Sequence, residues 1–187
     1  LTNDIPVMLL SVFFAPQIVG FYALANRVLR MPTTLIGNSI GEVYFQRATT
    51  YNKTELKEKT ILLFDKLLII GLMPLAILVI LGEEIFYIFL GEGWSESGLF
   101  AQIMGLTIFV RFLMNPAMYL MVILEKQNIQ LYMNIITVLV VIFAFSIGGF
   151  LNNVYISLAI MAILNSLVIL FIGLKLFKQI GITSQEI

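Results

Sequence analysis

The chain contains neither cysteine nor histidine. Without cysteine there is no disulfide, no thiol nucleophile and no thiolate metal ligand, and without histidine the commonest general base and metal ligand is missing. These two absences argue against enzymatic hydrolysis and against transition-metal chemistry. We therefore expect a protein that is not an enzyme, holds no metal and carries no cofactor.

Charged residues are also scarce, since they make up 12% of the 187 residues, whereas 60% are hydrophobic and the mean hydropathy is +1.00. These values lie far outside the range of soluble globular domains and indicate an integral membrane protein. The eleven basic and eleven acidic residues cancel, so no basic excess points to nucleic acid. Membrane lipids are the expected surroundings.

Long apolar stretches divide the chain into segments that approach the length of about 20 residues needed to cross a membrane. They run approximately over residues 4–14, 19–48, 58–81, 97–124, 129–150 and 154–177. The first is too short to cross alone, and the chain begins with Leu1 rather than Met, so we expect a fragment of a longer chain. The sequence predicts an all-α, polytopic membrane helical bundle of about six transmembrane helices, the first one truncated. We expect residues 1–187 to form this single bundle.

Basic residues alternate between the connections, and this alternation predicts the orientation because cytoplasmic loops attract Lys and Arg. Connections 15–18, 82–96 and 151–153 contain none, and connection 82–96 has four glutamates instead. The remaining connections and the end of the chain hold Arg47, Lys53, Lys57, Lys59, Lys66, Lys126, Lys175 and Lys178. We expect a multi-pass protein of the cytoplasmic membrane with both ends of the chain in the cytoplasm.

Local signals refine these connections and spans. Asn52 followed by Glu55 has the form of a capping box, which predicts a short surface helix that contacts anionic headgroups. The stretch 91–94 favours a turn in which the indole of Trp94 anchors at the outer interface. A proline is expected to interrupt three of the spans, at Pro32, Pro74 and Pro116.

The most informative charges are arginines inside the apolar stretches, because an arginine in hydrocarbon is costly unless it faces protein or water. Arg111 shares a helix face with Thr107 and Asn115 at the spacing i, i+4, i+8. A second face contains Ala23, Arg27, Arg30, Thr34, Gly37 and Gly41. No acid lies at comparable depth, so we predict a water-lined cationic cavity that receives an anionic ligand. The alternative is that each arginine pairs with a carboxylate outside this chain or caps backbone broken at a proline.

Three segments carry a resemblance to a known family. They are Asp4-Ile5-Pro6 with Ser11, Phe13 and Phe14; the run from Val19 to Arg27 with Pro32, Leu35-Ile36-Gly37 and Val43-Tyr44-Phe45; and Ile88-Phe89-Leu90-Gly91 with Trp94 and Gly98. The chain resembles the C-terminal portion of the polysaccharide biosynthesis, or O-antigen flippase, family of the multidrug/oligosaccharidyl-lipid/polysaccharide exporter superfamily. The resemblance implies one lobe of a two-lobed transporter that exposes a central cavity alternately to each side. Independently, an even number of helices with both ends in the cytoplasm favours one half of a repeated transporter.

The resemblance further implies a flippase for an undecaprenyl-pyrophosphate-linked oligosaccharide. In this hypothesis Arg27 and Arg30 attract the pyrophosphate or an acidic sugar, and Arg111 holds positive charge near the midplane. The side chains expected to hydrogen-bond sugar hydroxyls are Thr34, Asn38 and Asn115. A coupling ion, sodium or a proton, and the polysaccharide polymerase machinery are further candidate partners.

Two other classes of function remain open at this stage. A multidrug antiporter of the same superfamily exports a cationic drug and is expected to place carboxylates at depth, where this chain has arginines. A membrane scaffold or polymer-synthesis partner transports nothing, and tracer flux distinguishes it from either transporter.

Overall fold

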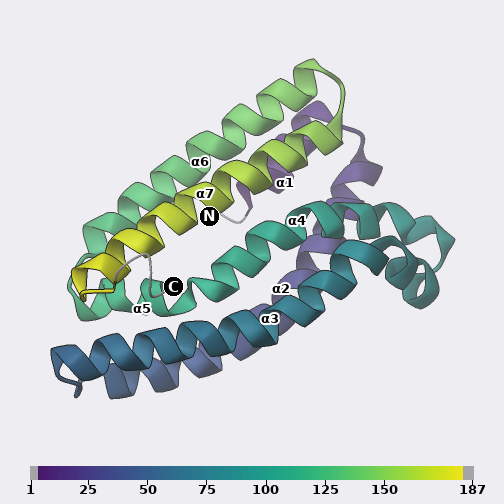
Figure 1. Cartoon of the computed structure of the whole chain (residues 1–187). Coiled ribbons are helices and arrows are strands. Elements are labelled where there is room, and N and C mark those ends of the chain that lie inside the picture. Colours follow the sequence, from purple (N-terminus) through teal and green to yellow (C-terminus); the bar gives the residue numbers. More distant parts are fainter. Residues whose placement is uncertain (1–3, 183–187) are drawn as a thin grey trace.

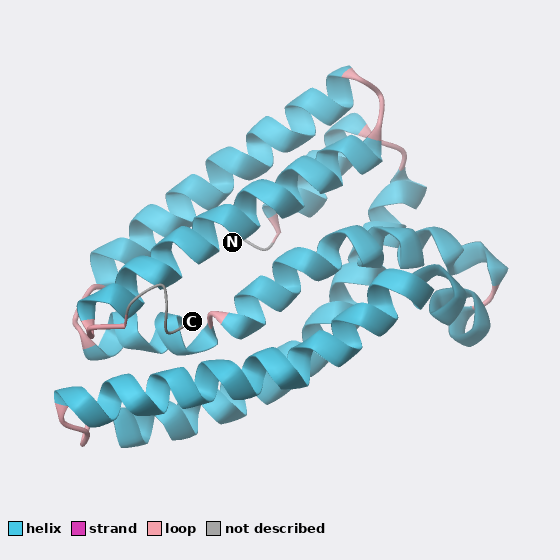
Figure 2. Cartoon of the chain, in the orientation of Figure 1, coloured by secondary structure: helices cyan, strands magenta, loops and turns pink. Residues whose placement is uncertain are grey.

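Residues 4–182 are described by the computed structural model, and within this range the chain is helical without any strand (Figures 1 and 2). The helices are α1 (Ile5–Phe13), α2 (Pro16–Ala48), α3 (Lys53–Leu90), α4 (Ser95–Leu113), α5 (Asn115–Ile123), α6 (Gln127–Phe150) and α7 (Val154–Gln179). A 3-10 turn, η1 (Glu92–Trp94), links α3 to α4. The prediction of an all-α membrane bundle is confirmed at this level.

The expected surface helix at Asn52 is not separate, because it forms the first part of α3. The capping box itself is present: the side-chain oxygen of Asn52 accepts from the backbone N–H of Thr54 and Glu55, both at 3.0 Å, and the Glu55 carboxylate accepts from the N–H of Asn52. The helix then continues without a break, through Pro74, for 38 residues, or about 57 Å. The connection expected at 82–96 is shorter in the structure and consists of Gly91 and η1. The φ of Gly91 is 93°, a value that favours glycine.

Of the three prolines expected to interrupt a span, only Pro116 lies at a break between helices. The predicted span 97–124 consists of α4 and α5, which are separated by one residue. Pro32 and Pro74 lie inside α2 and α3. Next to Pro32, the hydroxyl of Thr33 donates to the carbonyls of Leu29 and Arg30, both at 3.0 Å.

The prediction of about six transmembrane helices is not confirmed. Four segments within residues 4–182 are long and apolar enough to cross a membrane: α3, η1 with α4, α6 and α7. Helix α1 has nine residues and is too short. Helix α2 has 33 residues, but its polar and charged side chains make it less apolar than these four.

Helix α4 lies at the centre of the bundle and packs against α2, α3 and α7. Figure 1 shows α2 and α3 along one side of it and α1, α6 and α7 along the other. One apolar cluster joins α3, α5 and α7 through Phe64, Leu120 and Leu176, and a second joins α4, α6 and α7 through Phe100, Phe145 and Leu158. Between the two sides, polar side chains of α2, α4, α6 and α7 lie among apolar ones.

The crossing of α3 and α4 requires a close approach of their backbones at Gly82 and Gly98. A Cβ atom at Gly98 would lie 2.6 Å from the Cα of Glu83 and would also meet the carbonyl of Gly82. Small residues allow membrane helices to pack this closely. Gly98 therefore sets the position of α4 relative to α3.

Gly98→Ala is expected to destabilise the fold by about 1–3 kcal/mol, because the added methyl group meets backbone atoms that cannot rotate away. The measurement is the midpoint of unfolding in detergent. Gly20→Ala in α2 is the matched control, since nothing lies within 4 Å of a Cβ at that position. Equal midpoints for the two variants would contradict the close packing.

Candidate functional site

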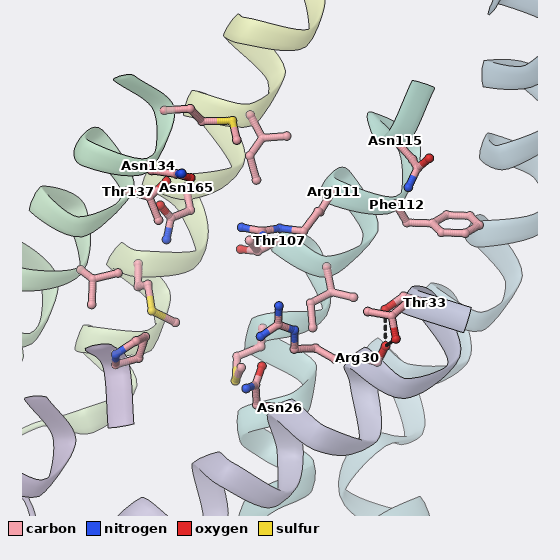
Figure 3. A pocket seen from close by; sticks show the side chains of 18 of the residues that line it. Asn26, Arg30, Thr33, Thr107, Arg111, Phe112, Asn115, Asn134, Thr137 and Asn165 are labelled. Atoms are coloured by element: carbon pink, nitrogen blue, oxygen red, sulfur yellow. Dashed lines mark hydrogen bonds between the residues drawn. The ribbon is translucent and has the colours of Figure 1, made fainter. Parts of the chain in front are cut away.

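A cavity of about 490 Å³ lies between α2 and α4 on one side and α6 and α7 on the other. This volume is in the range of sites that bind small molecules or the headgroups of larger ligands. Its polar side chains come from helices that are far apart in the sequence (Figure 3). The apolar part of the lining consists mainly of Pro6, Met104, Ile108, Val141, Met161 and Ile169.

Two arginines form a cationic wall of this cavity. Arg30 on α2 and Arg111 on α4 both project into the space between the helices (Figure 3). Arg30, Arg111 and the phenol of Tyr22 lie close enough to interact electrostatically. No carboxylate lines the cavity, and neither arginine forms an ion pair within the described range 4–182. Two neighbouring charges of the same sign, without an acid between them, favour an anion in the cavity.

Neutral polar side chains form the wall opposite the arginines. Gln130, Asn134 and Thr137 lie on one face of α6 at the spacing i, i+4, i+7, and Asn165 projects from α7. In Figure 3 the Arg111 side chain points toward the side where Asn134, Thr137 and Asn165 gather. Amides and hydroxyls both donate and accept hydrogen bonds. This amide wall, defined as Gln130, Asn134, Thr137 and Asn165, therefore complements a ligand with many hydroxyl groups.

Two asparagine oxygens at the cavity lack hydrogen-bond partners within the described residues. The Oδ1 atoms of Asn165 and Asn115 are both buried and unpaired, and the whole Asn165 residue is only 6% exposed. Buried polar atoms are nearly always hydrogen-bonded in native proteins, so an unpaired one beside a cavity indicates a ligand or water. By contrast, the hydroxyl of Thr107 donates to the carbonyl of Ala162 at 2.9 Å, which ties α4 to α7.

The structure brings five of the six predicted site residues together. Arg30, Thr34 and Asn38 of α2 line the cavity, as do Arg111 of α4 and Asn115 of α5. Arg27 does not line the cavity and is exposed. The prediction assumed that the site follows a face parallel to the helix axis.

The row of residues that lines the cavity on α2 explains the different position of Arg27. The cavity follows an i, i+4 row that consists of Tyr22, Asn26, Arg30, Thr34 and Asn38. Such a row is inclined to the helix axis by about 26°. Arg27 precedes Arg30 by three residues and therefore falls to one side of the row. Gly37 and Gly41 instead lie against α5, where a Cβ atom at Gly37 would be 3.2 Å from the Nδ2 atom of Asn115.

Sequence reasoning missed the amide wall and Asn26. The signal was present, because Gln130, Asn134 and Thr137 form a polar stripe within a predominantly apolar helix of 24 residues. Asn165, with Ser166 next to it, is likewise flanked by apolar runs in α7. What periodicity alone does not reveal is that these two faces meet the arginines of α2 and α4.

The fold and the cavity define a helical membrane protein with an internal cavity lined in part by polar side chains. Comparison with protein families matches residues 1–99 to a family described as polysaccharide biosynthesis protein. The match covers more than half of the 187 residues, so the chain belongs to this family, as the resemblance indicated. Neither the curated proteins nor the solved structures contain a match. The matched region includes Arg30, whereas Arg111 and the amide wall follow it along the chain.

Proposed function

We propose that the protein translocates an undecaprenyl-pyrophosphate-linked oligosaccharide across the cytoplasmic membrane for surface polysaccharide biosynthesis, O-antigen and lipopolysaccharide included. The observation that carries the proposal is the pair Arg30 and Arg111, which face an amide wall across one cavity without a carboxylate in its lining. Membership of the polysaccharide biosynthesis family supports a saccharide-bearing substrate. No covalent step is required, so the protein acts as a transporter and not as an enzyme.

The two walls of the cavity recognise chemically different parts of this substrate. Guanidinium groups bind phosphate oxygens bidentately and remain charged, which suits Arg30 and Arg111 to the pyrophosphate. Amides and hydroxyls of Asn134, Thr137 and Asn165 exchange hydrogen bonds with sugar hydroxyls. The lipid tail stays in the bilayer, because the helices that are long enough to cross the membrane are apolar on the outside of the bundle.

Alternating access fits a chain that forms the C-terminal lobe of a two-lobed transporter with both ends in the cytoplasm. In such transporters the substrate site lies near the midplane at the interface of two repeats, and one repeat rocks against the other. A sodium ion or a proton supplies the driving force in this scheme. The polysaccharide polymerase machinery receives the translocated repeat unit.

The competing function, export of a cationic drug, disagrees with the charge of the cavity. A cation entering the site would meet Arg30 and Arg111 without a carboxylate in the lining to compensate them. The low dielectric of a membrane protein interior strengthens this repulsion.

The test is a leaflet-accessibility assay with the purified full-length protein in proteoliposomes. A fluorescent polyprenyl-pyrophosphate oligosaccharide is expected to move between leaflets faster than in protein-free vesicles, whereas a cationic dye is not. Protein-dependent movement of the dye alone would support the antiporter, and movement of neither substrate would support a scaffold. Either result would overturn the proposal.

A further inference from the structure

A second cavity, of about 420 Å³, lies between the last turns of α2 and the first turns of α3. We call it the hairpin groove. Its cationic lining consists of Arg47, Lys59 and Lys66, and its apolar lining consists of Ile40, Val43 and Leu63. Tyr44 and Tyr51 complete its aromatic part. None of these residues lines the cavity that contains Arg30 and Arg111.

The register of the two helices brings the three cations into one groove. The hydroxyls of Tyr44 on α2 and Thr60 on α3 are hydrogen-bonded at 2.7 Å and fix the antiparallel pairing. On α3, Lys59, Leu63 and Lys66 follow one face at the spacing i, i+4, i+7. On α2, the facing row consists of Ser39, Val43 and Arg47. The α3 wall therefore alternates positive and apolar side chains, and the α2 wall adds the apolar Val43 and the cationic Arg47.

The three cations have no acidic partner in the groove. No carboxylate is part of its lining, and within residues 4–182 neither Arg47, Lys59 nor Lys66 takes part in an ion pair. Glu42, the nearest acid on α2, interacts electrostatically with Tyr119 of α5 instead. The groove thus concentrates positive charge that nothing in its own lining compensates.

The groove lies at the boundary between the charged and the apolar part of α3. Lys66 is the last charged residue before an uninterrupted uncharged stretch that ends at Glu83. Beyond Lys66, the surface of α3 is apolar and open, as Ile69 is 72% and Ile70 52% exposed. A fitting occupant has an anionic head at the level of the cations and a hydrocarbon chain that follows the apolar wall into the membrane.

We infer that the hairpin groove is a binding site for an anionic glycerophospholipid. Its phosphate lies among Arg47, Lys59 and Lys66, and an acyl chain lies along Ile40, Val43 and Leu63. A basic residue near an anionic membrane surface contributes about fivefold to lipid affinity, and three of them select an anionic over a zwitterionic headgroup. The inference uses no residue of the proposed transport site and does not depend on the proposed function.

The test places a fluorescent reporter beside the groove. Trp94 is the single tryptophan of the chain and lies at the other end of α3, so Trp94→Phe combined with Leu62→Trp gives one tryptophan next to the apolar wall. This protein, in phosphatidylcholine vesicles, is titrated with brominated phosphatidylglycerol or brominated phosphatidylcholine. We expect phosphatidylglycerol to reach half-maximal quenching at a mole fraction at least about tenfold lower. Equal quenching by the two lipids overturns the inference.

Charge substitutions assign the preference to the groove. In the protein with Trp94→Phe and Leu62→Trp, the further change Arg47→Gln/Lys59→Gln/Lys66→Gln is expected to abolish the preference for phosphatidylglycerol. Lys53→Gln/Lys126→Gln/Lys178→Gln removes three cations outside the groove, at the start of α3, the start of α6 and the end of α7, and is expected to retain the preference. These helix ends lie at the same end of the bundle (Figure 1). The site is contradicted if the groove variant keeps the preference while the control variant loses it, or if both variants lose it. All six residues are exposed, so both variants are expected to elute as the parent protein does.

Two competitors test the identity of the occupant. Soluble glycerol phosphate at millimolar concentration is expected not to reverse the quenching, because it lacks the chain that the apolar wall binds. A polyprenyl pyrophosphate added at the same mole fraction as phosphatidylglycerol is expected not to displace it. Displacement by the first overturns the acyl-chain assignment, and displacement by the second makes the groove a site for the polyprenyl lipid instead.

Discussion

Replacing Arg30 or Arg111 with glutamine is expected to reduce transport of a lipid-linked oligosaccharide by about tenfold to about 150-fold at each site. A hydrogen bond to a charged group contributes about 1.5–3 kcal/mol, and glutamine keeps a donor but loses the charge and the bidentate geometry. Both guanidinium groups face the same cavity, so the double variant is expected to transport no faster than protein-free vesicles. The measurement is the initial rate of leaflet exchange in proteoliposomes at matched protein content.

Arg27→Gln is the matched control for this prediction. Arg27 lies on the same helix, less than one turn from Arg30, but it is exposed and does not line the cavity. Its replacement removes the same charge and is expected to leave the rate within about twofold of the parent protein, as is usual for surface positions. A rate reduced equally by Arg27→Gln and Arg30→Gln would show that net charge, rather than the cavity, governs transport.

Asn165→Leu is expected to reduce transport by about fivefold to about 150-fold while leaving the stability of the fold unchanged or higher. The loss reflects a sugar hydroxyl left without a partner, which costs about 1–3 kcal/mol when buried. Stability is preserved because the Oδ1 atom of Asn165 is itself buried without a partner, and a side chain of similar size without that atom removes an unsatisfied group. Transport rate and unfolding midpoint are measured on the same preparation.

Ser166→Ala gives the contrasting result at the neighbouring position. The Ser166 hydroxyl donates to the carbonyl of Ala162 at 2.6 Å and to the hydroxyl of Thr107 at 3.3 Å, and it does not line the cavity. Its loss is expected to lower the unfolding midpoint and to leave transport nearly unchanged. If Asn165→Leu lowered the midpoint and the transport rate in parallel, the role of Asn165 would be structural.

Much of the helical framework was predictable from the sequence, because apolar runs end at polar turns. The predicted ends at residues 150 and 154 coincide with the limits of α6 and α7. The break between α4 and α5 was harder to locate, since Pro116 marks it but Pro32 and Pro74 are equally visible and lie inside helices. Whether a proline interrupts a helix depends on the neighbours that satisfy the freed backbone groups, and these are tertiary contacts.

The charged residues of the candidate site were predictable from the sequence. Arg30 and Arg111 stand out because a charge within an apolar segment is expensive in a membrane, and the structure places both in one cavity. Asn134 and Asn165 carry no charge, so they stand out less against the hydropathy of α6 and α7. The separation of Arg27 from Arg30 was not predictable, because it depends on the angle at which the cavity crosses α2. That angle is set by the packing of α2 against α1, α4 and α5, not by local periodicity.

The central claim is that Arg30 and Arg111 make the cavity attractive to anions, and thiol reactivity measures this most directly. The chain contains no cysteine, so Thr137→Cys places one thiol in the amide wall, opposite the arginines. Its reaction rates with an anionic and a cationic methanethiosulfonate are each divided by the rate with a free thiol in solution. The anionic reagent is expected to be favoured by at least about tenfold, and Arg30→Gln/Arg111→Gln is expected to bring the ratio close to one. A ratio near one in the parent, or a preference that survives loss of both arginines, would contradict the account.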